Sequence, residues 1–97
     1  MRKYELMAIF PIDEESAQKG AADMRETLST FGAEIEKEEL FGERDLTYEI
    51  AKHTRGKFML YTLPLNPDKL TDVDRQFKLN THLLKYLFVR LDEKKVR

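Results

Sequence analysis

Residues 42–58 read GERDLTYEIAKHTRGKF and carry the clearest structural signal in this 97-residue chain. Leu46, Tyr48 and Ile50 alternate with polar residues, which is the period of two expected of a strand with one buried face. A short turn around Gly56 is expected to follow, and it is surrounded by Lys52, His53, Arg55 and Lys57. Because the net charge of the chain is only −1, this local positive charge predicts a docking point for a negatively charged partner.

The residues before this stretch predict a strand followed by an amphipathic helix. Residues 3–10 alternate in the manner of a strand. Asp13 is a suitable N-cap for the helix, Gly20 weakens the helix slightly, and Gly32 stands where a helix C-terminal glycine belongs. The apolar stripe recurs at helical spacing and consists of Ala17, Ala21, Met24, Leu28 and Phe31.

The remaining residues predict two further strands and a second helix. Residues 33–41 begin an acidic edge strand, and Gly42 indicates a bulge before that strand continues. Residues 57–63 are apolar on both faces, as expected of a central strand. Asn66 is the expected cap of the second helix, and residues 83–91 form the last strand. The inner stripe of the second helix consists of Leu70, Val73 and Phe77.

The predicted order β-α-β-β-α-β indicates an α+β, ferredoxin-like fold, with a four-stranded antiparallel sheet and two helices on one face. We expect a single domain over residues 1–91 and a short charged tail over residues 92–97. Two helices cover only one face of such a sheet, so the other face should expose an apolar patch for a protein partner. The alternative is scattered surface hydrophobes. The patch would consist of Met7, Ile9, Phe58, Leu60, Leu87 and Val89.

Catalysis and metal binding find little support in the sequence. His53 and His82 stand far apart, without a metal-ligand pattern around either, and the chain has no cysteine. A phosphatase of this fold would need a glycine-rich phosphate loop where the chain has Pro11–Glu15, whose acids repel phosphate. We predict no catalytic residue and no metal site. We also expect no membrane span and no signal peptide, because no 18-residue apolar run is present and the first residues enter a strand pattern.

Charge is distributed unevenly, which favours contact with an RNA backbone. Residues 34–49 hold seven acids against two bases, and residues 75–97 hold seven bases against two acids. Ordinary solvated surface is the alternative interpretation. Base stacking on the sheet is not expected, because Arg55-Gly56-Lys57-Phe58 matches only the start of the aromatic motif that sheet-face RNA readers use. Phosphate contacts are predicted instead for Arg2, Lys3, Lys52, Arg55, Lys57, Lys85 and Arg90.

Three stretches together form a family signature. They are MRKYE at residues 1–5, Phe31-Gly32-Ala33, and a spaced set made of Gly42, Arg44, Leu46, Tyr48, Ile50, Lys52, Gly56 and Phe58. On these residues the whole chain resembles the bacterial small-subunit ribosomal protein six family. The resemblance implies a ferredoxin-like structural protein of the cytoplasmic ribosome without enzyme activity or cofactor. It also implies binding to the central domain of 16S ribosomal RNA, jointly with small-subunit ribosomal protein eighteen.

The resemblance also assigns residues to the two partners. Arg2, Lys3, Tyr4, Lys85 and Arg90 would lie near the RNA, and the protein partner would meet Leu46, Tyr48, Phe58 and Leu60. Tyr4 and Tyr48 are alternatively core residues. Asp45, Thr47 and Glu49 depart from the basic residue, alanine and proline usual in the family. The two added acids favour a basic protein over RNA at this strand. A second hypothesis is a stand-alone domain that dimerises through its open sheet face and binds a small effector.

Overall fold

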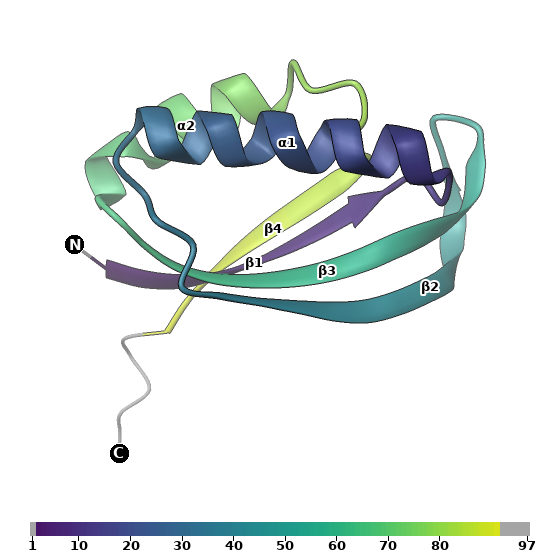
Figure 1. The fold of residues 1–97 in the computed structure, drawn as a ribbon, viewed down its shortest axis with the longest axis horizontal. Helices are drawn as coiled ribbons and strands as arrows, with labels where there is room; N and C mark the ends of the chain where they lie inside the picture. The colour runs from purple at the N-terminus through teal and green to yellow at the C-terminus, as the bar shows by residue number, and fades with distance from the viewer. Residues whose placement is uncertain (1, 92–97) are drawn as a thin grey trace.

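The computed structural model describes residues 2–91 and has the predicted order of elements (Figure 1). The predicted tail, 92–97, lies outside the described residues. The sheet has the strand order β2-β3-β1-β4, and all of its pairs are antiparallel. The edge position expected for the acidic strand and the central position expected for residues 57–63 are therefore confirmed. The elements are β1 (Arg2–Phe10), α1 (Glu14–Thr30), β2 (Lys37–Ile50), β3 (His53–Leu65), a 3₁₀ turn (Pro67–Lys69), α2 (Leu70–Phe77) and β4 (Lys85–Arg90).

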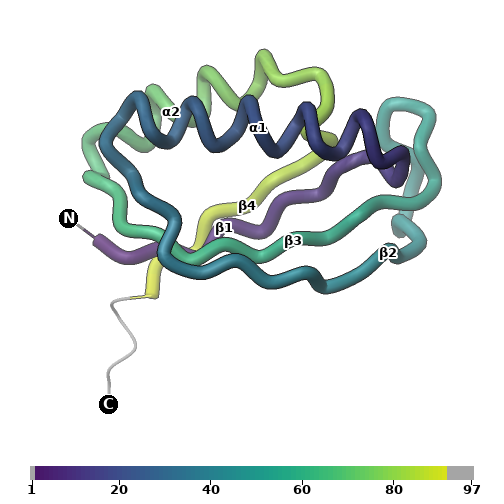
Figure 2. The backbone as a smooth tube through the Cα atoms, viewed as in Figure 1, coloured from purple at the N-terminus to yellow at the C-terminus, as the bar shows by residue number. Residues whose placement is uncertain are grey.

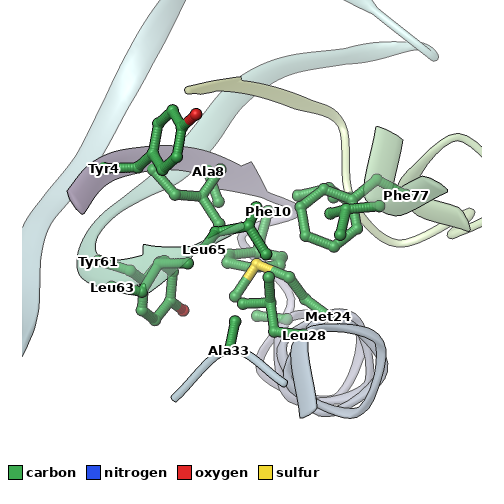
Figure 3. Close-up of a cluster of buried hydrophobic side chains, with 14 residues drawn as sticks. Tyr4, Ala8, Phe10, Met24, Leu28, Ala33, Tyr61, Leu63, Leu65 and Phe77 are labelled. Carbon is green, nitrogen blue, oxygen red and sulfur yellow. The ribbon is translucent and has the colours of Figure 1, made fainter. Parts of the chain in front are cut away.

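The two helices lie side by side on one face of the sheet and leave the other face uncovered (Figures 1 and 2). The core fills the space between the helices and the sheet (Figure 3). Alternate residues of β1 and β3 point into it, together with the predicted stripes of both helices. Its largest fully buried side chains are Tyr61, Phe10, Phe77, Leu6, Met24, Leu28, Leu63, Leu65 and Val73.

Local capping explains where the helices begin and end. The Asp13 carboxylate accepts a hydrogen bond of 2.9 Å from the Ser16 backbone N–H, as expected of an N-cap. Asn66 caps the 3₁₀ turn in the same way through Asp68, at 3.0 Å. Gly32 ends α1 with a φ of +79°, a left-handed conformation that favours glycine. The predicted boundaries of α1 are confirmed, whereas α2 begins only at Leu70, after the 3₁₀ turn and without a side-chain cap of its own.

Gly20 has a role that the sequence did not reveal. It is buried in the middle of α1, where the loop after α2 lies against it. The Asn80 side-chain amide donates a 3.0 Å hydrogen bond to the Gly20 carbonyl. A Cβ at residue 20 would lie only 2.5 Å from the carbonyl oxygen of His82. This close approach of two backbones requires glycine at this position.

The β2–β3 hairpin differs from the prediction in the place of its turn. The turn consists of Ala51 and Lys52, with φ values of 49° and 70°, whereas Gly56 lies inside β3. Placing the turn at Gly56 was wrong because Ala-Lys lacks the glycine or asparagine that usually marks a two-residue hairpin loop. The predicted bulge at Gly42 is confirmed by its φ of 99° and by the register shift beside it.

Two strand boundaries are also corrected. β2 begins at Lys37 rather than at residue 33, because residues 33–36 lead up to the sheet without forming a strand. Of these four residues only Glu36 bonds to the neighbouring strand, where its backbone N–H donates to the Thr62 carbonyl at 2.8 Å. β4 is shorter than the apolar run over residues 83–91, since Leu83 is buried in the core before the strand begins.

Candidate nucleic-acid and protein interface

The face of the sheet opposite the helices is apolar, as predicted. Ile9 pairs with Phe58, and Met7 pairs with both Leu60 and Leu87, so these side chains share the open face. Leu87 is 59% exposed. Among the described residues, no element covers the middle of this face (Figure 1). The arrangement leaves a contiguous apolar strip across the central strands.

One end of the open face is closed over by the β2–β3 hairpin. The register moves from Asp45 opposite Arg55 to Ile50 opposite His53, so residues 46–49 stand opposite a single residue of β3. These four residues, here called the β2 arch, depart from the regular ladder. The arch brings Leu46 against Gly56, where an added Cβ would lie 3.3 Å from Leu46 Cδ2.

Tyr48 reaches from the β2 arch to the far edge strand. The Lys85 ammonium donates a hydrogen bond of 3.2 Å to the Tyr48 hydroxyl and lies 5.5 Å from the centre of its ring. Such a contact combines a hydrogen bond with a cation–π attraction. Tyr48 is 63% exposed, so its alternative assignment to the core beneath the helices is wrong.

Beneath this contact is a cavity of about 170 Å³, here called the hairpin hollow. Three predicted partner residues, Leu46, Tyr48 and Phe58, line it together. Leu60 lies further along the open face, where it pairs with Met7. The structure therefore brings most of the predicted partner set into one site. Ile9, which the sequence places in the apolar patch of the open face, also lines the hollow. The sequence missed Ile50 as a member of that site, because the arch leaves no trace in the alternating pattern.

The predicted RNA-binding residues fall into two groups at opposite ends of the sheet. Arg2, Lys3 and Arg90 lie where β1 begins and β4 ends, as the pairing of Tyr4 with Arg90 shows. Lys85 pairs with Ile9 at the opposite end of β1. Lys52, Arg55 and Lys57 belong to the hairpin at that same end (Figure 1). The molecule is 38 Å long, so the two groups form separate surfaces.

Several of these bases already have acidic neighbours. Lys3 pairs with Glu36 at 3.0 Å, and Arg55 pairs with Asp45 at the same distance. The Lys57 ammonium lies 3.9 Å from the Glu14 carboxylate, on the helix side of the sheet. Exposed pairs of this kind contribute little to stability. A phosphate can therefore replace the carboxylate at low energetic cost.

Tyr4 is placed in the core. Only 3% of its surface is exposed, and Figure 3 shows it within the buried cluster. Its ring packs edge-on against Phe88, with 6.0 Å between ring centres. This position matches the core alternative considered for Tyr4 and leaves its ring buried away from any nucleic acid. The guanidinium of Arg44, a residue of the family signature, donates to the Phe41 carbonyl at 3.2 Å.

The acidic run is less negative in the structure than in the sequence. Three of its carboxylates have basic partners besides Asp45 with Arg55: Glu36 with Lys3, Glu38 with Arg25, and Glu39 with Lys37. The Arg25 guanidinium also lies over the Tyr61 ring, and burial raises the pKa of Tyr61 to about 12. The edge strand therefore keeps only part of its negative charge for a partner.

Within residues 2–91, no three His, Cys, Asp or Glu side chains are arranged to hold a metal ion. None of the helices in this described range is long and apolar enough to cross a membrane.

The fold and the open face define a ferredoxin-like α+β protein with an uncovered apolar sheet. The family model for ribosomal protein S6 matches residues 3–90. Small ribosomal subunit protein bS6 of Treponema denticola is 45% identical over 93 residues, covering 96% of this chain and all of the relative. The protein of the same name from Mycolicibacterium paratuberculosis is 33% identical, covering 96% of this chain and 99% of its own. The chain therefore belongs to the ribosomal protein S6 family.

A solved structure supports the fold independently. The crystal structure of 30S ribosomal protein S6 from Thermotoga maritima superposes with a TM-score of 0.79 at 20% identity, covering 93% of this chain and 87% of the other. The predicted ferredoxin-like plan is thereby confirmed. Proteins of the S6 family are structural, non-enzymatic components of the cytoplasmic ribosome, and this chain is accordingly not an enzyme.

Proposed function

We propose that this chain is a structural constituent of the small ribosomal subunit that binds the central domain of 16S ribosomal RNA jointly with small-subunit ribosomal protein eighteen. The observation that carries the proposal is the family match over residues 3–90, together with the 45% identical relative that is itself named as a small-subunit protein. The stand-alone dimerising domain has no comparable support.

The open face and the neighbouring edge support a protein partner. The apolar strip around Phe58 and Leu60 is left uncovered by both helices. Leu46 and Tyr48 extend it onto the edge strand, beside the exposed acids Glu43 and Glu49. An apolar centre bordered by charged residues is the usual form of a protein-binding surface.

The two basic ends support contact with the RNA backbone. Arg2, Lys3 and Arg90 form one phosphate-binding end, and the hairpin residues Lys52 and Arg55 are the main part of the other. With a net charge of −1, the chain gains little from long-range attraction to RNA. Two short basic surfaces on either side of a protein-binding face therefore favour assembly with the RNA and the protein partner together. Tyr4 is left out of the proposed RNA set because it is buried, and Lys85 is assigned to the partner side with Tyr48.

Binding to a labelled fragment of the 16S central domain tests this function. The full chain is titrated into the RNA with and without protein eighteen at fixed salt. We expect roughly tenfold tighter binding or more when the partner is present. Equal affinity in both titrations would argue against joint assembly.

Charge-reversal variants test the basic end. Lys3→Glu with Arg90→Glu is expected to weaken RNA binding and to reduce its salt dependence. Lys19→Glu with Arg75→Glu is the matched control, because it reverses the same residue types on the exposed surface of the two helices. An equal effect of the two double variants would remove the basic end from the proposed RNA surface.

A further inference from the structure

The β2–β3 hairpin uses two different registers. The first register places Asp45 opposite Arg55, and the second places Ile50 opposite His53. Between these two pairs, residues 46–49 of the β2 arch stand out of the ladder, and the hairpin bends at this end of the sheet (Figure 2). The hairpin therefore changes register within a few residues of its turn.

The first register could also continue towards the turn. It would then place Leu46 opposite Thr54 and Thr47 opposite His53, and the arch would become regular ladder. The register of a strand is weakly specified where its side chains are polar and exposed. Three of the four arch residues are exposed, and only Leu46 is half-buried. The burial pattern therefore does little to prevent this straight hairpin.

The observed turn carries backbone strain that a straight hairpin would reduce. Ala51 and Lys52 have φ values of 49° and 70°, and this left-handed conformation is unfavourable for residues with a Cβ. Continuing the first register would place Lys52 opposite Tyr48, in the extended conformation of a strand. Strain of this kind is often found in segments that have two conformations.

The contacts that oppose this change are few. The Lys85 ammonium donates a 3.2 Å hydrogen bond to the exposed Tyr48 hydroxyl and lies 5.5 Å from the centre of its ring. Leu46 and Ile50 also lie against the hairpin hollow, but a cavity of about 170 Å³ separates its walls, so their packing is incomplete.

The arch has a visible effect on the open face beneath it. Ile9 and Phe58 belong to that face and line the hollow under the arch. Ile9 is only 8% exposed, whereas Leu87 on the same face is 59% exposed. The arch therefore covers one end of an otherwise open apolar surface.

We propose that the β2 arch is a strap that exchanges with a straight hairpin, and that the contact between Lys85 and Tyr48 is the latch that keeps it closed. In the closed state the arch covers Ile9 and Phe58. In the straight state the first register continues and uncovers them. The inference concerns the free chain, so its test needs no partner, and its failure would leave the proposed function standing.

Chemical-exchange saturation transfer NMR on the isotopically labelled free chain tests for the second state. We expect a minor state confined to residues 46–54 and Lys85. In that state the Cα and Cβ shifts of Thr47 and Lys52 should be those of an extended strand. Absence of such a state from both the unaltered chain and Lys85→Met, or a minor state with random-coil shifts, would overturn the inference.

Variants of the latch and of the turn should change the minor population in opposite directions. Lys85→Met keeps the aliphatic stem and removes the ammonium, so it should raise that population roughly tenfold. Ala51→Asn with Lys52→Gly favours the turn of the closed state and should lower it roughly tenfold. Lys19→Met is the matched control, because Lys19 is exposed on α1, and it should have no effect. A population that neither the latch variant nor the turn variant changes would contradict the proposal.

A reversible disulfide provides an independent test. The chain has no cysteine, so Ile50→Cys with His53→Cys introduces a single pair of thiols at residues that are opposite each other only in the closed register. Opposite residues of antiparallel strands have the spacing that a disulfide needs. Oxidation should abolish the exchange, and reduction should restore it. Exchange that persists in the oxidised protein would show that the motion is not the proposed change of register.

Discussion

Replacing Gly20 by alanine should destabilise the protein, although helix propensity alone predicts the opposite. In an exposed helix interior, glycine to alanine stabilises by about 1 kcal/mol. Here the new Cβ would lie 2.5 Å from the His82 carbonyl oxygen, which is backbone and cannot move aside as a flexible side chain can. Overpacking of this kind typically costs about 1–3 kcal/mol.

A second loss follows from the same displacement. Moving the loop away from α1 breaks the 3.0 Å hydrogen bond from Asn80 to the Gly20 carbonyl, which contributes about 1 kcal/mol. The clash and the lost bond together outweigh the gain in propensity, so Gly20→Ala should lower the free energy of unfolding by about 1–3 kcal/mol. For a domain of this size, each kcal/mol corresponds to a fall of about 4–8 °C in Tm.

Urea denaturation of the variant at neutral pH measures this effect. Ala22→Gly is the matched control, because residue 22 is exposed on the same helix, and the swap should cost about 1 kcal/mol by propensity alone. A rise of about 1 kcal/mol in the free energy of unfolding of Gly20→Ala would instead show that the loop gives way without cost and that the close approach does not require glycine.

Three further perturbations test other features of the fold. Ala51→Asn with Lys52→Gly should stabilise the protein by about 1–2 kcal/mol in urea denaturation, because both residues have positive φ and Asn-Gly favours this turn; a loss of stability would contradict the turn assignment. The pKa of Tyr61 is raised from 10.0 to about 12 by burial, so the unfolded state releases this proton at lower pH and stability should fall as pH rises from 10.0 towards 12. Tyr61→Phe should lose less stability than the unaltered chain over that range, and parallel losses would exclude Tyr61 as a cause. The hydrogen bond from Ser16 lowers the pKa of Asp13 below 3.8, so the cap stabilises the fold above that pH and stops doing so as the carboxylate is protonated. Asp13→Ala should therefore lower the free energy of unfolding at neutral pH and match the unaltered chain in acid. A difference in stability that stays constant with pH would argue against the charged cap.

The features that local sequence determines were predictable. The alternation in β1 and the helical stripes that include Leu28 and Phe77 correspond to buried faces in the structure. Asp13 caps α1 because the cap depends on residues three positions apart. The open face was also predictable, because two helices cover only one face of a four-stranded sheet.

The features that depend on distant residues were not predictable. Leu46, Tyr48 and Ile50 alternate as they would in a straight strand, so the sequence gives no sign of the β2 arch. The contact between Tyr48 and Lys85 joins residues 37 positions apart, and a glycine such as Gly20 shows a close approach only when its neighbour in space is known. The acids Glu36 and Glu38 also pair with the distant bases Lys3 and Arg25, so counting charges along the sequence overstates the negative charge of this region.

Quantitative mass spectrometry of ribosomal particles separated on a sucrose gradient tests the central proposal most directly. We expect the chain to co-sediment with the small subunit at close to one copy for each 16S ribosomal RNA. We also expect subunits assembled without protein eighteen to contain much less of the chain. Finding the chain only in the unbound fraction, while small subunits carry their full set of other proteins, would overturn the proposed function.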